Sequence, residues 1–555
     1  MDTKHYDAVV VGSGPAGSTA VKELTERGLE VLLLEAGRDL TEADFEPLPP
    51  SEPKEMSVGL YDRVKAGLMG QHVQARRAMF QPQKSKFLVN DMRNPYTTDG
   101  GDFLWIRGRQ LGGRFHAYGR VLLRSSDHEF KAASHDGHGA DWPISYKDLA
   151  PYYDHVEEYM GVYGTTENLS NLPDGRYVGP SLFTEAEKHF KETVEGNWSS
   201  RHVVPWRYQA PNLARVPVGI VAAKKTGRLT IRTDAVVHKV TMNRKTGRAD
   251  GVLFIDRLSK KQQHVTADVV VLCASTIESV RIMLNSATEG HADGLGNSSG
   301  MLGSYFMDQT PSLLFGTDPA RPGYEVVNPA PEDPYYPAVG GVYVPRFDNL
   351  TSVGKQETAY ARGWAVQGTI GRIPVPEGAP GVVGLMGFGE MLPYRSNRIT
   401  IDPRRKDAWG IPAPRIKLEI TENERHLMRA QVAGLKEMAL SAGYTINFAG
   451  SALGLDSKKI WPNVDPVSRA IFRLGFKKSL AMGAAIHECG GARMGNDPAT
   501  SVLNEFNQSW DVPNLFVTDA SSYVSNGAVG PTLTIMAITA RACDYIAKEH
   551  AAGTL

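Results

Sequence analysis

The sequence predicts an α/β protein in which a Rossmann-type nucleotide-binding domain is joined to a second, α+β domain built on an antiparallel sheet. Three observations support this prediction. A strand, a glycine-rich turn, a helix and a second strand follow one another over residues 6–35. Residues 229–274 form a strand-rich meander, whose last segments, 264–266 and 269–274, are expected as separate strands. Residues 311–479 alternate strand-like segments with long loops and then give a long helix.

The N-terminal unit begins with an apolar run, residues 6–11, that is typical of a buried strand. The run leads directly into a G-x-G-x-x-G turn. Gly12 permits the tight turn, Gly14 lets the backbone approach a pyrophosphate, and Gly17 lets the helix pack on the strand. The helix N-terminus offers free N–H groups to phosphates. The alternative is a glycine-rich turn in an ordinary α/β protein.

The second strand of this unit, residues 31–34, ends at an acidic residue. Glu35 stands 18 residues after Gly17 (35 − 17), where a carboxylate accepts hydrogen bonds from an adenosine ribose. The same carboxylate would repel a 2′-phosphate, which disfavours NADP. The sequence therefore predicts a dinucleotide site with contacts from Gly12, Gly14, Pro15, Ala16, Gly17, Glu35 and Ala36.

The composition is that of a globular protein with two or more domains, because 555 residues exceed one simple core. Lys plus Arg and Asp plus Glu both number 61, so neither nucleic acid nor an anionic membrane surface is an expected partner. No apolar run reaches the ~18 residues needed to cross a bilayer.

The three cysteines form no C-x-x-C pair, which suits a reducing compartment, and no metal ligands are expected. The first strand starts within a few residues of Met1 and leaves no room for a signal peptide. We therefore expect a cytoplasmic protein, although export with a separately targeted partner subunit is left open.

Two motifs near the C-terminus are further candidates for chemistry. The first, residues 485–495, contains His487 followed by a glycine pair. The second, residues 514–521, reads as a short strand and turn, and Pro531 then suits the first turn of a helix. Glycine precedes this helix, and its N-terminus could stabilise an anion. An isolated histidine is more often structural, so the importance of His487 rests on its motif.

Together these motifs resemble the glucose–methanol–choline (GMC) oxidoreductase family, nearly from end to end of the chain. The resemblance implies oxidation of a CH–OH group by bound FAD, with a small-molecule alcohol, sugar or glycoside as substrate. It looks closest to the bacterial branches that act on sugars, sugar acids and glycosides. The segments that carry it are the N-terminal fingerprint and residues 109–113, 141–146, 274–281, 389–393, 407–412, 487–495 and 531–537.

The resemblance also implies how the domains divide. An FAD-binding domain of the p-hydroxybenzoate hydroxylase-like type would be discontinuous and comprise residues 1–45, 95–130, 205–310 and 480–555. Residues 46–94 and 131–204 would be lid or insert segments, and residues 311–479 the substrate-binding domain. Candidates for the pocket wall in that domain are Gln367, Glu390, Tyr394 and Arg395.

Residue by residue, the resemblance implies further cofactor contacts. The implied set is Arg109, Gly112, Gly113, His116, Ala117, Val237, Ala274, Asp519, Ala520, Thr532 and Leu533. His487 matches the active-site histidine, which would accept the hydroxyl proton while a hydride passes to flavin N5. Negative charge that then gathers at the pyrimidine edge would be stabilised by the helix that starts at Thr532.

Two departures from the family pattern matter. Several relatives bond FAD covalently through a histidine four residues after the second glycine of the GG turn. Here that position is Ala117, and His116 precedes it, so we expect non-covalent FAD. The family usually places Asn or His just before the Pro-Thr helix start, where this chain has Gly530. Asn526 and Tyr523, in the same loop, are candidates for a compensating catalytic side chain, although they read equally well as turn residues.

Other functions stay open at this point. Some members of the family keep FAD but catalyse lyase reactions without net redox change. A flavin-binding partner without turnover is a third hypothesis, which the retained His487 disfavours. A non-sugar alcohol is an alternative substrate. The electron acceptor is undetermined, since oxygen, a quinone, a soluble carrier or a partner cytochrome would all fit, and a homo-oligomer is also left open.

Overall fold

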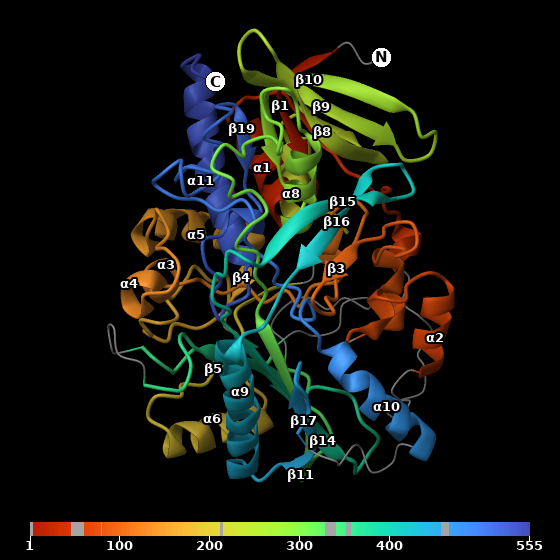
Figure 1. Ribbon diagram of the computed structural model, residues 1–555. Coiled ribbons are helices and arrows are strands. Elements are labelled where there is room, and N and C mark those ends of the chain that lie inside the picture. Colours follow the sequence, from red (N-terminus) through yellow and green to blue (C-terminus); the bar gives the residue numbers. More distant parts are fainter. Residues whose placement is uncertain are drawn as a thin grey trace.

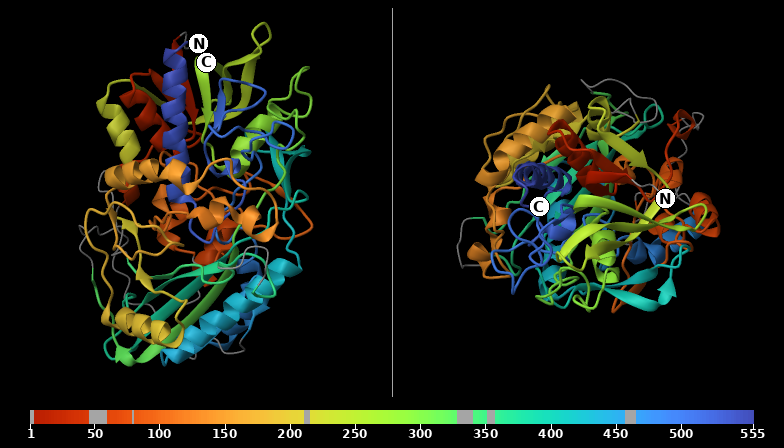
Figure 2. Two further views of the ribbon diagram at one scale, coloured as in Figure 1. Left: turned by 90° about the vertical axis from the view of Figure 1, so that its left-hand side faces the viewer. Right: turned by 90° about the horizontal axis from the view of Figure 1, so that it is seen from above.

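The computed structural model describes residues 4–45, 60–78, 80–210, 215–327, 340–350, 357–456 and 465–555. Figure 1 shows two lobes: one contains both chain ends and a mostly parallel sheet, and the other is built on an antiparallel sheet. Figure 2 shows the lobes arranged along the long axis of the molecule, with both termini at the same end. The α/β fold class that the sequence predicts is confirmed.

The nucleotide lobe is organised around a seven-stranded sheet of order β7-β2-β1-β10-β9-β8, with β19 also paired to β10. The parallel strands are β1 (His5–Val11), β2 (Val31–Leu34), β7 (Leu229–Arg232), β10 (Gln262–Leu272) and β19 (Leu515–Val517). The antiparallel meander consists of β8 (Ala235–Asn243) and β9 (Arg248–Asp256).

Helices cover both faces of this sheet, which is why β1 and β2 are apolar on both sides. Val10 and Leu33 pack toward α1 (Pro15–Glu26), whereas Val9 and Leu32 share a core with α8 (Thr276–Asn285). α1 also packs against α7 (Val218–Lys225) and the C-terminal helix α11 (Thr532–Ala551), which in turn contacts α5 (Tyr146–Met160). The alternation follows from the two-residue period of a strand.

One expected feature of this sheet is wrong. Residues 264–266 and 269–274 were expected as two strands, but β10 is continuous from Gln262 to Leu272. The polar residue that suggests a break, Asp268, lies at the exposed end of the sheet and accepts hydrogen bonds from His5 and His550. The backbone therefore continues pairing with β1 through Ala267.

The second lobe contains a seven-stranded antiparallel sheet of order β18-β17-β11-β14-β13-β12-β5. Its strands are β5 (Val204–Pro205), β11 (Thr310–Pro322), β12 (Val342–Val344), β13 (Trp364–Ile370), β14 (Pro380–Gly389), β17 (Thr445–Ser451) and β18 (Gly454–Leu455). Helices α9 (Glu422–Ser441) and α6 (Glu185–Asn197) pack on this sheet, as Figure 1 shows.

Strand β14 separates a helix-covered face from a face that is open to a cavity. Gly387 and Gly389 lie toward α9, because a Cβ on Gly389 would come 2.8 Å from Cδ2 of Leu427. Met386 and Phe388 alternate with these glycines and line the cavity instead. The glycines thus let α9 approach the sheet closely, while the side chains between them form part of the site.

Shorter elements complete the structure, and none of the described helices has the length and apolarity that a membrane span requires. The other strands are β3 (Thr97–Asp99), β4 (Val162–Tyr163), β6 (Tyr208–Gln209), β15 (Arg398–Lys406) and β16 (Pro412–Lys417). The other helices are α2 (Leu60–Leu68), α3 (Asp127–Phe130), α4 (Ala132–Asp136) and α10 (Pro466–Ser479). The 3-10 turns are η1 (Glu42–Phe45), η2 (Gln74–Arg76), η3 (Pro82–Phe87), η4 (Gly113–His116) and η5 (Ala520–Ser522).

The domain boundaries stay a prediction. The segment expected as a lid, residues 46–94, contains α2, η2 and η3, but residues 46–59 and 79 lie outside the described part of the chain.

Candidate active site

A cavity of about 430 Å³ runs between the two lobes. One end is bordered by the loops that follow β1, β2 and β10, and the other by side chains of β13 and β14. The carboxyl ends of parallel strands are where open α/β sheets bind ligands. The predicted site residues on this cavity are Gly12, Gly14, Pro15, Ala16, Glu35, Ala36, Arg109, Gly113, Ala117, Val237, Ala274, His487, Asp519, Ala520 and Thr532.

The fingerprint turn is shaped by its glycines. Gly12 has φ +98°, and a Cβ there would lie 2.5 Å from the Cys273 carbonyl oxygen. A Cβ on Gly17 would lie 1.8 Å from the Gly12 carbonyl oxygen, so the first turn of α1 touches the preceding loop. A Cβ on Gly14 would meet no atom within 4 Å. Gly12 and Gly17 therefore serve packing, whereas Gly14 leaves the backbone open to a ligand.

Glu35 links the fingerprint to the GG turn. Its carboxylate accepts hydrogen bonds from the Ser13 hydroxyl at 2.5 Å and from the Gly37 N–H at 2.8 Å. The Ser13 Oγ in turn accepts the Gly112 N–H at 2.9 Å. Burial raises the pKa of the Glu35 carboxyl, and these hydrogen bonds oppose the rise. The carboxylate lies at the cavity wall and each oxygen keeps lone pairs for a ligand.

Three arginines near the GG turn are anchored by acids. Arg109 pairs with Glu278 at 2.9 Å, and Arg114 pairs with Glu488 at 2.7 Å. Arg107 lies 3.7 Å from Glu278 and also stacks over the Trp105 ring, 3.4 Å from its centroid. The GG turn is thus held against α8 and the His487 loop by ion pairs, with Arg109 and Arg114 on the cavity wall.

His487 is oriented by a side chain that the sequence does not single out. Its Nδ1 lies 2.6 Å from Oε1 of Gln309. The amide nitrogen of Gln309 donates to the carbonyl oxygens of Gly527 at 2.5 Å and Val529 at 2.8 Å, which fixes Oε1 as an acceptor. The proton of the neutral imidazole therefore sits on Nδ1, and Nε2 carries a lone pair. None of the described residues forms a hydrogen bond to Nε2.

The backbone around His487 is held by Asp308. Its carboxylate accepts the N–H groups of His487 at 3.1 Å and Gly483 at 2.7 Å. Burial, with the charge of Glu488 nearby, raises the pKa of Asp308 to about 7. Burial and the nearby Arg114 guanidinium lower the pKa of His487 to about 3, so the imidazole is neutral at physiological pH. The lone pair on Nε2 is therefore available.

The two candidates for a second catalytic side chain do not line the cavity. Asn526 accepts the Met391 N–H and donates to the Asp308 carbonyl, so its amide is engaged by backbone. The Tyr523 hydroxyl donates to the Pro531 carbonyl at 2.9 Å. The hypothesis that either compensates for Gly530 stays a prediction, and these hydrogen bonds do not favour it. Gly530 itself borders His487, since a Cβ there would lie 3.7 Å from Cε1 and Nε2 of the ring.

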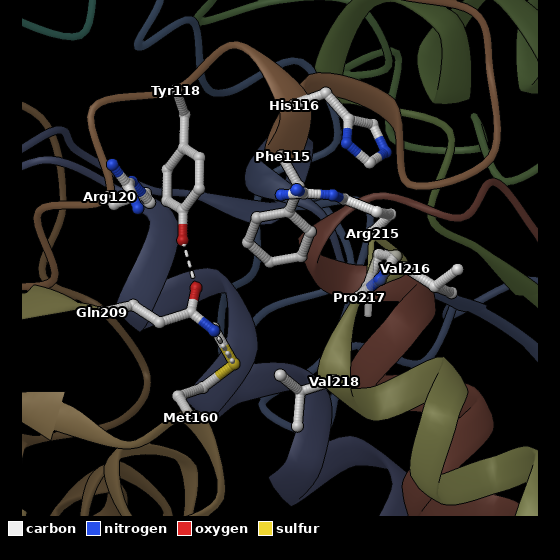
Figure 3. A pocket seen from close by; sticks show the side chains of 10 residues that line it. All are labelled: Phe115, His116, Tyr118, Arg120, Met160, Gln209, Arg215, Val216, Pro217 and Val218. Atoms are coloured by element: carbon white, nitrogen blue, oxygen red, sulfur yellow. Dashed lines mark hydrogen bonds between the residues drawn. The ribbon is translucent and has the colours of Figure 1, made fainter. Parts of the chain in front are cut away.

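His116 also turns away from the cavity that holds the fingerprint. Its Nε2 bonds the Leu111 carbonyl at 2.8 Å, and its ring packs against Phe45 and Phe87. In Figure 3 the rings of Phe115 and Tyr118 lie together, whereas the His116 ring occupies the other side of the turn. The His116 side chain lines a smaller, separate pocket, and its expected cofactor contact stays a prediction.

Of the other predicted cofactor residues, Gly17, Gly112 and Leu533 stand behind the cavity wall. Gln367 lies on the wall, but Glu390, Tyr394 and Arg395 do not, which corrects that expectation. Glu390 is fully buried and pairs with Arg346 at 2.8 Å. Sequence reasoning missed Gln309, Asp308, Ser13 and Arg77, since single polar residues without a motif give no signal.

A nucleotide fingerprint that faces an uncharged imidazole across one cavity defines a class, an oxidoreductase that uses a bound dinucleotide. The comparisons then identify the family. The family model for the N-terminal region of GMC oxidoreductases matches residues 6–308, and the model for the C-terminal region matches residues 393–539. The chain belongs to the GMC oxidoreductase family, and it is an FAD-dependent enzyme that oxidises CH–OH groups.

Among similar proteins is the 2-methyl-1,2-propanediol dehydrogenase of Mycolicibacterium austroafricanum, 28% identical over 98% of this chain and 95% of that protein. Another is the fructose dehydrogenase large subunit of Gluconobacter japonicus, 25% identical over 99% of both chains. A formate oxidase variant from Aspergillus oryzae has a similar structure, with a TM-score of 0.66 at 14% identity over 100% of both chains.

The cavity fits FAD. The open backbone at Gly14 and the N-terminus of α1 suit its pyrophosphate, and Glu35 suits the adenosine ribose. Nη1 of Arg109 is buried and has no hydrogen-bond partner among the described residues, so it is free to meet the cofactor. The N-terminus of α11 would face the pyrimidine edge, because Pro531 and Thr532 lie on the same wall as His487.

Proposed function

We propose that this enzyme oxidises a hydroxyl group of a sugar or glycoside, with His487 as the general base. The observation that supports the base assignment most directly is the lone pair on Nε2, which faces the cavity while Nδ1 is held by Gln309. The names of two relatives, for a sugar and for a small diol, support a polyhydroxylated substrate. The bound FAD supplies the acceptor for the hydride.

The chain's own residues have three tasks in this proposal. Nε2 of His487 accepts the hydroxyl proton, while Gln309 keeps the imidazole in the required tautomer and orientation. Met386 and Phe388 cover the substrate side with apolar surface, and Phe388 packs on the His487 ring with centroids 5.3 Å apart. A dry wall strengthens the electrostatic interactions inside the site.

Catalysis with one histidine side chain is part of the proposal. Gly530 offers only backbone beside Nε2, and neither Asn526 nor Tyr523 reaches the cavity. The backbone N–H groups at the start of α11 then stabilise negative charge in place of a second side chain. The lyase alternative is not favoured, because both relatives named above are dehydrogenases.

We also propose that FAD is held without a covalent bond. Ala117 lies on the cavity wall and has no reactive side chain, and the His116 ring is engaged on the other side of the turn.

The three cysteines are buried and form no disulfide, which supports the cytoplasm as the location. The identity of the electron acceptor and a homo-oligomeric state stay predictions, and size-exclusion chromatography with light scattering tests the second.

The proposal is tested by anaerobic reduction of the flavin. Purified holoenzyme is mixed with sugars, glycosides and simple diols, and loss of the visible flavin absorbance is followed. We expect bleaching by at least one sugar or glycoside, and His487→Ala should slow it by about 10²–10⁴-fold. His264→Ala, an exposed histidine outside the cavity, is the matched control. Turnover without bleaching would favour a lyase, and a near-normal rate in the His487 variant would refute the base assignment.

A further inference from the structure

One arginine on the cavity wall has no partner within the described part of the chain. Arg77 is 7% exposed, and its Nε is buried without a hydrogen bond. None of the described residues forms an ion pair or a hydrogen bond with its guanidinium. A buried cation without a counter-charge is costly, and such groups are normally paired. Arg77 nevertheless lines the same cavity as His487, so its terminal nitrogens are open to a ligand there.

The acids on the cavity wall cannot supply the missing charge, because each is already engaged. Glu278 pairs with Arg109 and Arg281, and Glu488 pairs with Arg114. Glu35 and Asp519 accept hydrogen bonds from neighbouring serines. Beside the loop that carries Arg77, Asp91 accepts two backbone N–H groups and Asp102 pairs with Arg76.

The surroundings of Arg77 are positive. Arg63 lies close enough to lower the pKa of Arg77, which burial brings to about 10. Lys84, on the same cavity wall, has a pKa lowered to about 8 by burial and by the charges of Arg120 and Arg77. Arg63 and Lys84 therefore lie near Arg77, and neither can supply the counter-charge that its guanidinium lacks.

This part of the cavity is the substrate side. Ala78 packs in one apolar cluster with Met386, Leu480 and Ala484, and its N–H donates to the Ser479 carbonyl at 3.2 Å. These neighbours lead to His487 and to β14, not to the fingerprint. The guanidinium of Arg63 fixes the Arg77 loop by donating to the carbonyl oxygens of Ala75, Arg77 and Ala78. The loop that carries Arg77 is thus held in place by Arg63, while the terminal nitrogens of the Arg77 guanidinium face the cavity.

We propose that the substrate is an alcohol that also carries an anionic group, and that Arg77 binds that group while the carbinol meets His487. This specifies the substrate class and rests on the proposed function. A guanidinium fork matches the geometry of a carboxylate or of a phosphate monoester. Sugar acids, hydroxy acids and sugar phosphates fit this description, whereas an uncharged sugar leaves the guanidinium unpaired.

The experiment compares acids with their neutral amides on the holoenzyme. Anaerobic flavin reduction is measured with gluconate, glucuronate, galacturonate and glycerate, each against its amide, and with glucose 6-phosphate against glucose. We expect an anionic member to reduce the flavin at least 10-fold more efficiently, measured as the rate constant divided by the dissociation constant. The carboxylate and phosphate arms identify the source of the charge.

Variants locate the effect. Arg77→Met should lower this efficiency about 10- to 100-fold for the anionic substrate, through weaker binding, and leave the neutral partner within about 3-fold, because a charge-assisted hydrogen bond is lost only for the anion. Arg77→Lys should recover part of the loss. Arg76→Met is the matched control, since Arg76 pairs with Asp102 and is not on the cavity wall.

Each outcome decides the inference. Equal efficiency of both members of every pair, or an equal loss for both in Arg77→Met, overturns it and leaves the proposed function intact. If no alcohol reduces the flavin, the proposed function fails, and a second readout still tests Arg77. Malonate and inorganic phosphate should raise the melting temperature of the holoenzyme but not of Arg77→Met, and the absence of any difference would then overturn the inference.

Discussion

Replacing Gln309 tests how the imidazole is held. In Gln309→Leu the Nδ1–H of His487 loses its acceptor at 2.6 Å and is left buried without a partner. In Gln309→Glu the acceptor is kept and gains a charge. Both variants lose the amide N–H groups that bind the carbonyl oxygens of Gly527 and Val529. Comparing the two variants therefore distinguishes the contact of Gln309 with His487 from the structural role of its amide nitrogen.

The magnitudes follow from the contact. An unsatisfied buried donor costs about 1–3 kcal/mol, so flavin reduction in Gln309→Leu should slow by roughly 10- to 100-fold. A carboxylate beside the imidazole favours its charged form and raises its pKa by about 1–3 units. The wild-type pKa of His487 is about 3, so the rate should be flat above about pH 5. In Gln309→Glu the rate should fall below about pH 5–6, because a protonated imidazole cannot act as a base.

The assay is stopped-flow, anaerobic flavin reduction across this pH range, with the free energy of unfolding measured beside it. Both variants should be destabilised, because they lose the same two amide bonds, and Gln309→Glu more so, because a carboxylate oxygen then faces the two carbonyl oxygens. The reasoning is refuted if Gln309→Leu reduces the flavin at the wild-type rate, or if the pH profile of Gln309→Glu superimposes on that of the wild type.

Other predictions concern the cofactor and stability. Gly14→Ala should weaken FAD binding about 10-fold or more and leave the stability of the apoprotein near normal. Gly17→Ala should destabilise the apoprotein itself, because its Cβ would lie 1.8 Å from the Gly12 carbonyl oxygen. FAD titration measures the first effect, and thermal unfolding of the apoprotein measures the second. His116 has a folded-state pKa of about 4 against an ordinary 6.5 because of burial, so its contribution to stability is lost as pH falls from about 6.5 toward 4. Between these pH values the free energy of unfolding of His116→Phe should therefore fall by about 3 kcal/mol less than that of the wild type, as measured by urea titration. An equal fall in both proteins would contradict the lowered pKa of His116. Acid precipitation should release all yellow colour into the supernatant, and a coloured pellet would indicate covalent FAD.

The fold was largely predictable because its signals are local. The apolar runs, the glycine spacing and Glu35 lie within 35 residues, and they determine two strands, a helix and a turn in the order observed. Asp268 misled the prediction, since a polar residue within an apolar run indicates a break. Its position at the exposed end of the sheet depends on His5 and His550, which no local pattern reveals.

The active site was predictable only where the family motif carries it. His487 and the strand end at Asp519 were found in this way. Gln309 lies 178 residues from His487 and has no motif of its own, so only the folded chain brings the two together. Asn526 stands four residues before Gly530, but its side chain points to the backbone of Asp308 and Met391. Closeness to Gly530 in the sequence is therefore a poor guide to the role of Asn526, because the path of the loop determines where its side chain points.

The order of strands in the nucleotide lobe also affects how the enzyme is made. The fingerprint leaves the ribosome before much of its own lobe, because α1 packs on α11, and β19 enters the same sheet about 500 residues later. At about 5–20 residues per second, the first strand waits roughly 25–100 s for these neighbours. FAD can be enclosed only after β19 and the start of α11 have been synthesised. Until then the apolar β1–α1 unit is exposed on the nascent polypeptide, where it is a natural target for chaperones.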